Sequence, residues 1–218
     1  MRISERMIKD VVTISRNDTL ETAMKTMRDK GIRHMPVVDG GKLTGLLSLS
    51  DVRRAMPSQV STLDVREATY LFDRVKVKDA LPEHQKLITI ASDDFIEEAA
   101  LLMRSYKIGS LPVVDAGGAL VGIVTESNIF DAFVELLGVR STGSRLTVEM
   151  NNKPGTLAEL TEIITKFDVN IARIAMFPPT DSTTYEAVIR LDTGDIDPIV
   201  EMLRLHGFKV LSAKSYAR

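Results

Sequence analysis

The chain contains an internal repeat, because the stretch from Ile32 to Asp51 (IRHMPVVDGGKLTGLLSLSD) returns from Ile108 to Asn128 (IGSLPVVDAGGALVGIVTESN). Equivalent positions lie 76 residues apart through the two Pro-Val-Val-Asp segments and 77 apart afterwards, since the second turn has one extra residue. Self-similarity of this kind indicates repeated structural units. An insertion confined to a turn implies that both copies adopt the same fold.

Each copy predicts elements in the order β-α-β-β-α. The opening strands are Val11 to Ser15 and Ile88 to Ile90. Apolar residues then recur at i, i+3, i+4 and i+7, the spacing of one helical face, and they are Leu20, Ala23, Met24 and Met27 in the first copy and Ile96, Ala99, Ala100 and Met103 in the second. Candidate helix caps precede both faces, and they are Asn17, Asp18 and Thr19, and Ser92, Asp93 and Asp94.

The second half of each copy predicts a β-hairpin, because two apolar strands flank a Gly-rich turn. Closing helices are expected near Val52 to Met56 and near Ile129 to Leu137. Between the copies, Leu63 to Arg74 has a helical though irregular apolar pattern.

The pattern changes after Gly138, where a joint from Ser141 to Ser144 is expected. Beyond it, alternating and helical spacings predict the order β-α-β-β-α-β, which is ferredoxin-like. The expected elements are a strand with Leu146, Val148 and Met150, a helix with Leu157, Leu160, Ile164 and Phe167, strands at Val169 to Phe177 and Tyr185 to Leu191, a helix with Ile196, Ile199, Val200 and Leu203, and a strand at Lys209 to Ala213.

Composition limits the classes of chemistry. The 218 residues contain no cysteine, which excludes thiolate nucleophiles, disulfides and cysteine metal sites within the chain. His34, His84 and His206 lack metal-ligand spacing, so neither a metal site nor a catalytic site is predicted. The net charge of −2 gives no overall attraction to nucleic acid or anionic lipid. No apolar run reaches the length of a membrane span or a signal peptide, so a cytoplasmic protein is expected.

The repeated pattern h-P-V-V-D followed by G-h-h-[ST]-x-x-[DN] resembles a pair of CBS domains, called a Bateman module. The segment with NKPGTL and VNI resembles an ACT domain, and the combination, with a loosely matching linker at Thr62 to Leu81, is similar to the AcuB family of acetoin-utilisation proteins. The resulting α+β division is CBS repeat 1 at 1–60, a partly helical linker at 61–76, CBS repeat 2 at 77–139, a linker at 140–144 and an ACT domain at 145–218.

The CBS resemblance implies a cleft for an adenosine ligand such as AMP, ADP, ATP or S-adenosylmethionine. The matching positions are Ser48 and Asp51, their equivalents Thr125 and Asn128, the basic pair Arg33 and His34, and the strand residues Val12, Thr13, Ile14, Ile88, Thr89 and Ile90. A carboxylate at Asp51 can accept hydrogen bonds from both ribose hydroxyls, whereas an amide carries no charge. We therefore predict a strong site at Asp51 and a weak or empty one at Asn128. An alternative without a ligand stays open: Ser48 and Asp51 can serve only as helix caps, and the β-branched residues can serve only as the core of their strands.

The ACT resemblance implies a small effector, commonly an amino acid, bound near the first strand-helix loop at a dimer interface. The matching positions are Asn152, Pro154, Gly155, Leu157 and Asn170. Asn-Lys-Pro-Gly is also an ordinary turn, and dimerisation is the favoured reading of this domain.

The expected function is a non-catalytic regulator that binds an adenosine ligand, forms a homodimer through its CBS and ACT domains, and controls an unknown metabolic partner. The alternative is a dimerisation scaffold whose clefts bind nothing. An enzyme is disfavoured, because no nucleophile, acid-base pair or metal constellation converges on any motif.

Overall fold

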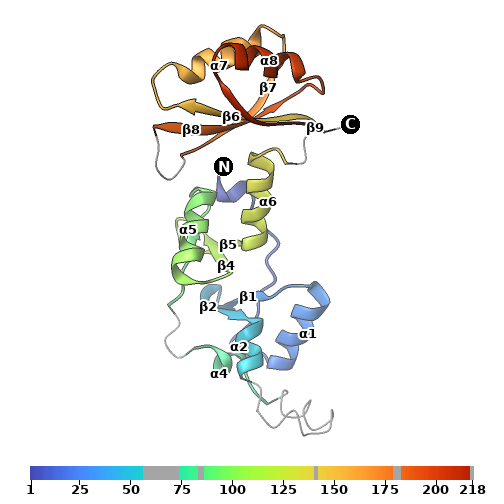
Figure 1. The fold of residues 1–218 in the computed structure, drawn as a ribbon. Coiled ribbons are helices and arrows are strands. Elements are labelled where there is room, and N and C mark those ends of the chain that lie inside the picture. Colours follow the sequence, from blue (N-terminus) through green and yellow to red (C-terminus); the bar gives the residue numbers. More distant parts are fainter. Residues whose placement is uncertain (56–73, 83–85, 140–141, 179–182, 217–218) are drawn as a thin grey trace. The chain divides into compact units, whose positions relative to one another are not determined.

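The computed structural model describes residues 1–55, 74–82, 86–139, 142–178 and 183–216. The chain forms two compact units, Met1–Ala132 and Phe133–Arg218. The first unit contains both copies of the repeat, and the second contains the ferredoxin-like domain (Figure 1). The mixed α+β fold expected from the sequence is confirmed. Among the described residues no helix is both long and apolar enough to cross a membrane.

The first copy of the repeat consists of α1 (Leu20–Lys30), the antiparallel hairpin β1 (His34–Asp39) and β2 (Lys42–Ser48), and α2 (Leu49–Arg54). Thr19 caps α1, and its side chain accepts a hydrogen bond from the Thr22 amide. Leu20, Ala23 and Met27 are buried in a core with the hairpin, as their spacing predicts.

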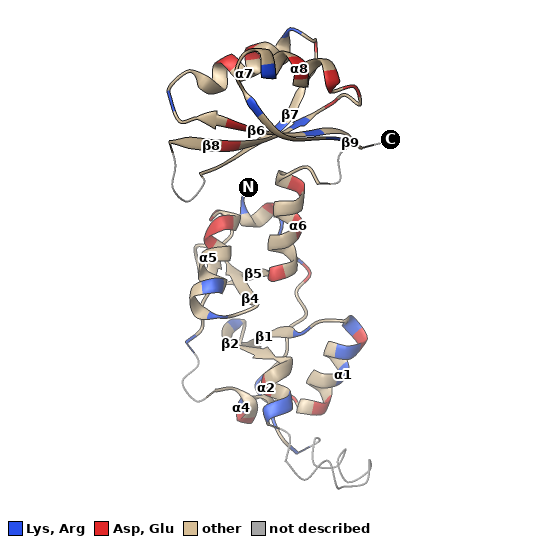
Figure 2. Ribbon diagram, viewed as in Figure 1, with Lys and Arg blue, Asp and Glu red and all other residues tan. Residues whose placement is uncertain are grey.

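The second copy repeats this plan with β3 (Ile90–Ala91), α5 (Ile96–Tyr106), β4 (Ser110–Val114), β5 (Leu120–Thr125) and α6 (Glu126–Leu136). The predicted caps of α5 are wrong, because Phe95 occupies the N-cap position. The Glu98 carboxylate accepts a hydrogen bond from the Phe95 amide, with 2.8 Å between the nitrogen and Oε2. Asp94 instead closes the preceding turn by accepting from the Ala91 amide. In α1 and α5 acidic residues lie in the first turn and basic residues in the last (Figure 2), the arrangement that a helix dipole favours.

The opening strands are shorter than predicted because a proline ends each ladder. Ile14 pairs with Val37 in a single parallel bridge, with hydrogen bonds from the Ile14 amide to Pro36 O and from the Val38 amide to Ile14 O. The next bond toward the N-terminus would need an N–H on Pro36, which proline lacks. Pro112 limits β3 in the same way, so β3 begins at Ile90, beside Val113. Val12, Thr13, Ile88 and Thr89 therefore lie outside any strand.

The two copies exchange their leading turns. The N-terminal turn η1 (Ile3–Glu5) packs in the core of the second copy, where Ile3 is fully buried. The equivalent turn α4 (Val77–Ala80), which precedes the second copy in the chain, packs in the core of the first, where Val77 is fully buried. Backbone hydrogen bonds join Ile8 and Ile123 in both directions, at 2.9 and 3.0 Å. Each core is thus completed by the chain segment that leads into the other copy.

The second unit is an antiparallel sheet in the order β7-β8-β6-β9, with two helices on one face (Figure 1). Its elements are β6 (Gly143–Asn151), α7 (Thr156–Thr165), β7 (Ile171–Phe177), β8 (Thr184–Leu191), α8 (Asp197–Leu205) and β9 (Lys209–Tyr216). The inward residues of the central strands, Leu146, Val148, Ala187 and Ile189, are fully buried against Leu160, Ile164 and Leu203. The predicted β-α-β-β-α-β order is confirmed.

Some element boundaries differ from the sequence interpretation. The closing helices α2 and α6 begin three residues earlier than expected, because Ser48 and Thr125 act as their caps. Strand β6 already includes Gly143 and Ser144, which pair with Tyr216 and Leu191. The expected helix at 63–74 lies outside the described residues except for Arg74.

We expect Gly122→Ala to destabilise the first unit. A Cβ at Gly122 would lie 2.5 Å from Met7 Sδ and 3.2 Å from the Ile8 carbonyl oxygen, so the leading segment would have to shift. Overpacking of this kind costs about 1–3 kcal/mol of the free energy of unfolding. Urea unfolding followed by circular dichroism measures the change. The control is Gly194→Ala, where no heavy atom lies within 4 Å of the added Cβ. Equal unfolding midpoints for the two variants would contradict the proposed packing.

Candidate functional site

A cleft of about 390 Å³ lies between the two copies of the repeat. The first copy contributes residues 31–34, from the end of α1 to the start of β1. The second copy contributes Gly109, Ile123 and the start of α6 at Thr125, Glu126 and Ser127, and Ile8 of the leading segment completes the wall. The cleft therefore exists only when both copies are present.

The helices α2 and α6 begin at equivalent positions of the two copies with matching capping hydrogen bonds, and of the two starts only that of α6 lines the cleft. In the first copy the Asp51 carboxylate accepts hydrogen bonds from the Ser48 amide and hydroxyl, and Ser48 Oγ accepts from the Asp51 amide. In the second copy Asn128 Oδ1 accepts from the Thr125 amide at 2.9 Å and from the Thr125 hydroxyl at 2.7 Å. The side chains of Asp51 and Asn128 thus hold the caps in position. Asp51 is 8% exposed, and the remaining oxygen, Oδ1, lies 3.5 Å from Arg54.

His34 and Glu126 meet beside Gly109, across the boundary between the copies. A Cβ built on Gly109 would lie 3.3 Å from His34 Cε1 and 3.5 Å from Glu126 Oε2, so both side chains occupy the space that a larger residue would need. Burial lowers the pKa of His34, the carboxylates of Glu126 and Asp51 act to raise it, and Arg33 acts to lower it further. The imidazole is therefore held toward its neutral form.

The predicted nucleotide-binding residues fall into three groups. Arg33, His34 and Thr125 line the cleft. Asn128 accepts a hydrogen bond from the Thr125 amide and does not itself line the cleft. Ser48 and Asp51 occupy the equivalent helix start in the first copy. The remaining six lie at the opening segments, where Ile14 and Ile90 are buried in the two cores and Val12, Thr13, Ile88 and Thr89 are more accessible.

Seven cleft-lining residues were absent from the predicted site: Ile8, Gly31, Ile32, Gly109, Ile123, Glu126 and Ser127. For Gly109, Glu126 and Ser127 the repeat itself carries a signal that could have identified them. Gly109 is the equivalent of Arg33, and Glu126 and Ser127 directly follow the Thr of the repeated motif. Their positions on the wall depend on how the copies pack, which the repeat pattern does not specify.

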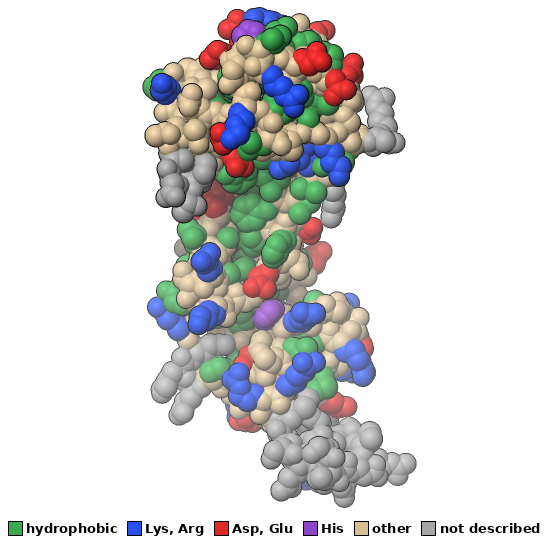
Figure 3. All heavy atoms as spheres, in the orientation of Figure 1, with side chains coloured by type: hydrophobic (Ala, Val, Ile, Leu, Met, Phe, Trp, Pro, Cys, Tyr) green, Lys and Arg blue, Asp and Glu red, His purple; other side chains and the backbone are tan. Residues whose placement is uncertain are grey.

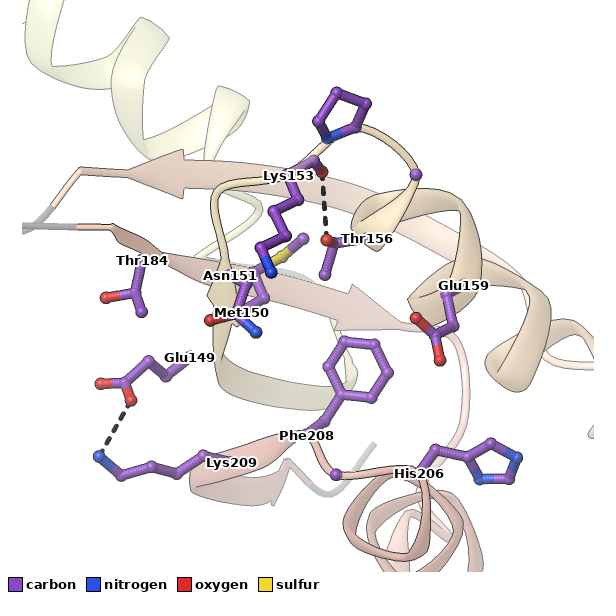
Figure 4. A pocket seen from close by; sticks show the side chains of 13 residues that line it. Glu149, Met150, Asn151, Lys153, Thr156, Glu159, Thr184, His206, Phe208 and Lys209 are labelled. Atoms are coloured by element: carbon purple, nitrogen blue, oxygen red, sulfur yellow. Dashed lines mark hydrogen bonds and ion pairs between the residues drawn. The ribbon is translucent and has the colours of Figure 1, made fainter.

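A second cavity, of about 560 Å³, lies in the ferredoxin-like domain where the loop before α7 meets the turn before β9 (Figure 4). Pro154 and Gly155, two of the predicted effector-binding residues, line it. The other lining residues are Glu149, Met150, Asn151, Lys153, Thr156, Glu159, Thr184, His206, Gly207, Phe208 and Lys209. Glu149 pairs with Lys209 at 3.0 Å, and the Thr156 hydroxyl donates to Lys153 O (Figure 4).

The structure does not bring all five predicted effector residues together. Asn152 and Leu157 are exposed residues next to the cavity in sequence, but neither lines it. Asn170 lies beyond the far end of α7, and its amide donates to Asp192 at 2.7 Å. The length of α7 therefore separates Asn170 from Pro154 and Gly155. Sequence reasoning also missed the charged lining residues. Glu149, Lys153 and Glu159 lie in or close to the predicted loop in the sequence, whereas Lys209 comes from the distant strand β9.

Comparison with protein families identifies the repeated unit. The CBS domain model matches residues 3–58 and 77–135, which together make up more than half of the chain. This chain is a CBS-domain protein. The ACT domain model matches residues 144–205. The resemblance read from the sequence, tandem CBS domains followed by an ACT domain, is confirmed.

Curated relatives of the CBS-domain protein include proteins of different length. It is 32% identical over 136 residues to a CBS domain-containing protein of Dictyostelium discoideum, covering 62% of this chain and 92% of that protein. It is 30% identical over 176 residues to an inosine-5'-monophosphate dehydrogenase of Korarchaeum cryptofilum, covering 81% of this chain. The CBS-domain protein matches only 33% of that dehydrogenase's length.

Solved structures that resemble the CBS unit include the following two. A Vibrio cholerae protein assigned as the acetoin utilization protein AcuB is 30% identical, with a TM-score of 0.53, and the match covers 64% of this chain and 95% of that one. The CBS domain pair of protein MJ0100, in complex with 5'-methylthioadenosine and S-adenosyl-L-methionine, is 25% identical, with a TM-score of 0.51, and the match covers 65% and 98%.

In the described part of the CBS-domain protein, no group of three or more His, Cys, Asp or Glu side chains could hold a metal ion. Exposed apolar side chains gather instead on the helices of the second CBS repeat (Figure 3). Phe130 on α6 is 72% exposed and Leu101 on α5 is 64% exposed. The equivalent positions of the first repeat hold Arg53 and Lys25, so this apolar surface belongs to the second repeat.

We expect His34→Gln to reduce the pH dependence of stability. The folded-state pKa of His34 lies below the ordinary value of 6.5, so the unfolded chain binds a proton at this imidazole more readily than the folded chain does. The folded state therefore loses stability as the pH falls below the ordinary pKa of histidine. The stability of the native chain relative to His34→Gln should therefore increase between about pH 5 and about pH 7 and then level off. Urea unfolding of both proteins across this range measures the difference, and a difference that decreases with pH would contradict it.

Proposed function

We propose that this chain is a regulatory protein that binds an adenosine-containing ligand in the cleft between its CBS repeats. The observation that carries the proposal is the cleft itself, which both repeats line and which ends at the N-terminus of the 11-residue helix α6. Ligands that combine adenosine with a polar tail, namely AMP, ADP, ATP or S-adenosylmethionine, are the proposed class. The ligand is regulatory, and the chain itself is proposed to have no catalytic activity.

The polar groups of the cleft suit the two ends of such a ligand. The helix N-terminus and Arg33 favour an anionic group on the tail. The hydroxyls of Thr125 and Ser127 can exchange hydrogen bonds with ribose. Outside the lining of the cleft, the carbonyl groups of Val12 and Ile88 lack a ladder partner, because Pro36 and Pro112 have no N–H to donate. These carbonyl groups are the proposed acceptors for an adenine amino group.

Similarity to the MJ0100 domain pair supports the same ligand class, because that protein was solved with two adenosine compounds. Its match covers 98% of the MJ0100 chain, so the comparison concerns the whole CBS pair. The similarity to AcuB adds acetoin or related carbon metabolism as the proposed context for the regulated partner.

The proposed output is a change in the arrangement of the repeats that a partner protein or a second copy can sense. Such coupling requires the ligand to bind two arrangements with unequal affinity. We also propose a homodimer through the CBS and ACT domains and a cytoplasmic location. The boundaries of the two CBS repeats, the linkers and the ACT domain stay predictions.

The alternative function is a dimerisation scaffold that binds no ligand. The exposed Phe130 and Leu101 favour a protein contact on the second repeat. Mass spectrometry of the purified chain under non-denaturing conditions separates the two functions, because a sensor retains or accepts an adenosine compound and a scaffold shows subunits alone.

We expect Ser127→Trp to abolish ligand binding while the fold is retained. Ser127 is exposed at the start of α6 and lines the cleft, so an indole there fills space that the ligand needs. Titration calorimetry with 5'-methylthioadenosine should show at least about a tenfold loss of affinity. The matched control is Ser50→Trp, at the equivalent position of the first repeat, which should retain binding in the cleft.

The same titrations test the predicted strong site at Asp51. If Asp51 holds the ribose, Asp51→Ala should weaken binding by about 10–100-fold, corresponding to about 1.5–3 kcal/mol. Loss of binding in Ser50→Trp and Asp51→Ala, with Ser127→Trp unaffected, would place the ligand at α2 and contradict the cleft assignment. Circular dichroism of each variant checks that the fold persists.

A second candidate function is amino-acid binding by the ACT domain, favoured by the cavity beside Pro154 and Gly155. Lys153 and the N-terminus of α7 suit a carboxylate. Glu159 suits an ammonium group, and Phe208 adds an apolar surface for a side chain. These groups complement the two charges of a free amino acid.

We expect amino acids to raise the thermal unfolding midpoint of the native chain, and Lys153→Ala to lose most of this response. The physical reason is that Lys153 is proposed to pair with the ligand carboxylate. The control is Lys166→Ala, at the opposite end of α7, which should respond like the native chain. A thermal-shift screen in which adenosine compounds give a response and amino acids give none would reject this second function.

A further inference from the structure

The cleft between the CBS repeats carries one charge of each sign, and each comes from a different repeat. Arg33 of the first repeat and Glu126 of the second both line it. His34, the third titratable side chain of the lining, is held toward its neutral form by burial. A ligand in the cleft therefore meets a guanidinium from one repeat and a carboxylate from the other.

The equivalent position in the first repeat has a different character. Leu49 stands where the second repeat has Glu126, and Gly109 and Ser110 stand where the first has Arg33 and His34. The charged pair thus occurs at one of the two equivalent positions and is not a general consequence of the repeated fold. It is a property of these particular side chains.

Glu126 bears directly on the charge of the bound tail. It is an exposed residue in the first turn of α6, and its carboxylate lies beside Gly109 and near His34. The helix N-terminus and Arg33 attract an anion, but a polyphosphate carries several negative charges and would bring some of them close to this carboxylate. A tail with both a carboxylate and a cationic centre can satisfy Arg33 and Glu126 together.

We propose that this cleft selects an adenosine compound with a zwitterionic, amino-acid-like tail over adenosine polyphosphates, with Glu126 facing the cationic centre and Arg33 the carboxylate. This inference rests on the proposed function and specifies the ligand class of the same site. Specificity arises from both an attractive and a repulsive element, because the carboxylate of Glu126 attracts the sulfonium or ammonium group and repels phosphate.

The experiment is titration calorimetry of the full chain with three probes: 5'-methylthioadenosine, whose tail is uncharged, S-adenosylmethionine, and ATP. The native chain should bind S-adenosylmethionine at least about tenfold more tightly than ATP. Glu126→Gln should reduce this ratio by about tenfold or more, with the affinity for 5'-methylthioadenosine nearly unchanged. Arg33→Gln should weaken S-adenosylmethionine relative to 5'-methylthioadenosine.

The matched control is Glu97→Gln, which removes an exposed carboxylate from the first turn of α5, outside the cleft lining. It should leave all three affinities as in the native chain. Tighter binding of ATP than of S-adenosylmethionine by the native chain, or a ratio that Glu126→Gln leaves unchanged, would overturn the inference. If 5'-methylthioadenosine binds and the ratio is independent of Glu126, the inference fails alone. If none of the three probes binds, the proposed function fails with it.

Discussion

The exchange of leading turns between the CBS repeats is the contact on which the cleft depends. Ile3 is fully buried in the second core and Val77 in the first, and burial of an aliphatic side chain stabilises by about 1.5–3 kcal/mol. Moving one repeat away from the other would expose both side chains and break the paired backbone bonds of Ile8 and Ile123. The repeats therefore pack as one compact unit, and the walls of the cleft come from both of them.

Two prolines, by contrast, shorten the parallel strand pairing within each repeat. Pro36 and Pro112 stop the parallel ladders after one or two residue pairs, because a proline nitrogen cannot donate. The residues directly before Ile14 and Ile90 consequently do not become strands. Backbone carbonyl groups that a longer ladder would have used are left to other partners, so a feature that weakens the sheet supplies polar groups to the adjoining surface.

Much of the fold could be predicted from the sequence because each repeat and the ACT domain have clear local periodicity. The apolar spacing in α1 and α5 and the alternation in β6 and β8 identify the same residues that the structure buries, such as Leu20, Ile96 and Leu146. The lining of the cleft was harder to predict, since Glu126 and Gly109 become neighbours of His34 only through the packing of one repeat on the other. Likewise Asn170 and Gly155 both belong to the predicted effector site, but they lie at opposite ends of α7. Local pattern specifies elements, whereas a site also needs the distances between them.

The departure from symmetry in the cleft has a steric basis. His34 Cε1 would lie 3.3 Å from a Cβ on Gly109, so the second repeat cannot place a residue like Arg33 at its equivalent position without moving the imidazole. The basic pair Arg33 and His34 in the first repeat therefore fits against a small residue in the second, and the charges at the two equivalent positions differ. Because Gly109 has no side chain, the Glu126 carboxylate also lies in this space. The duplicated fold supplies two equivalent positions, and the space that His34 takes at the boundary makes them chemically unequal.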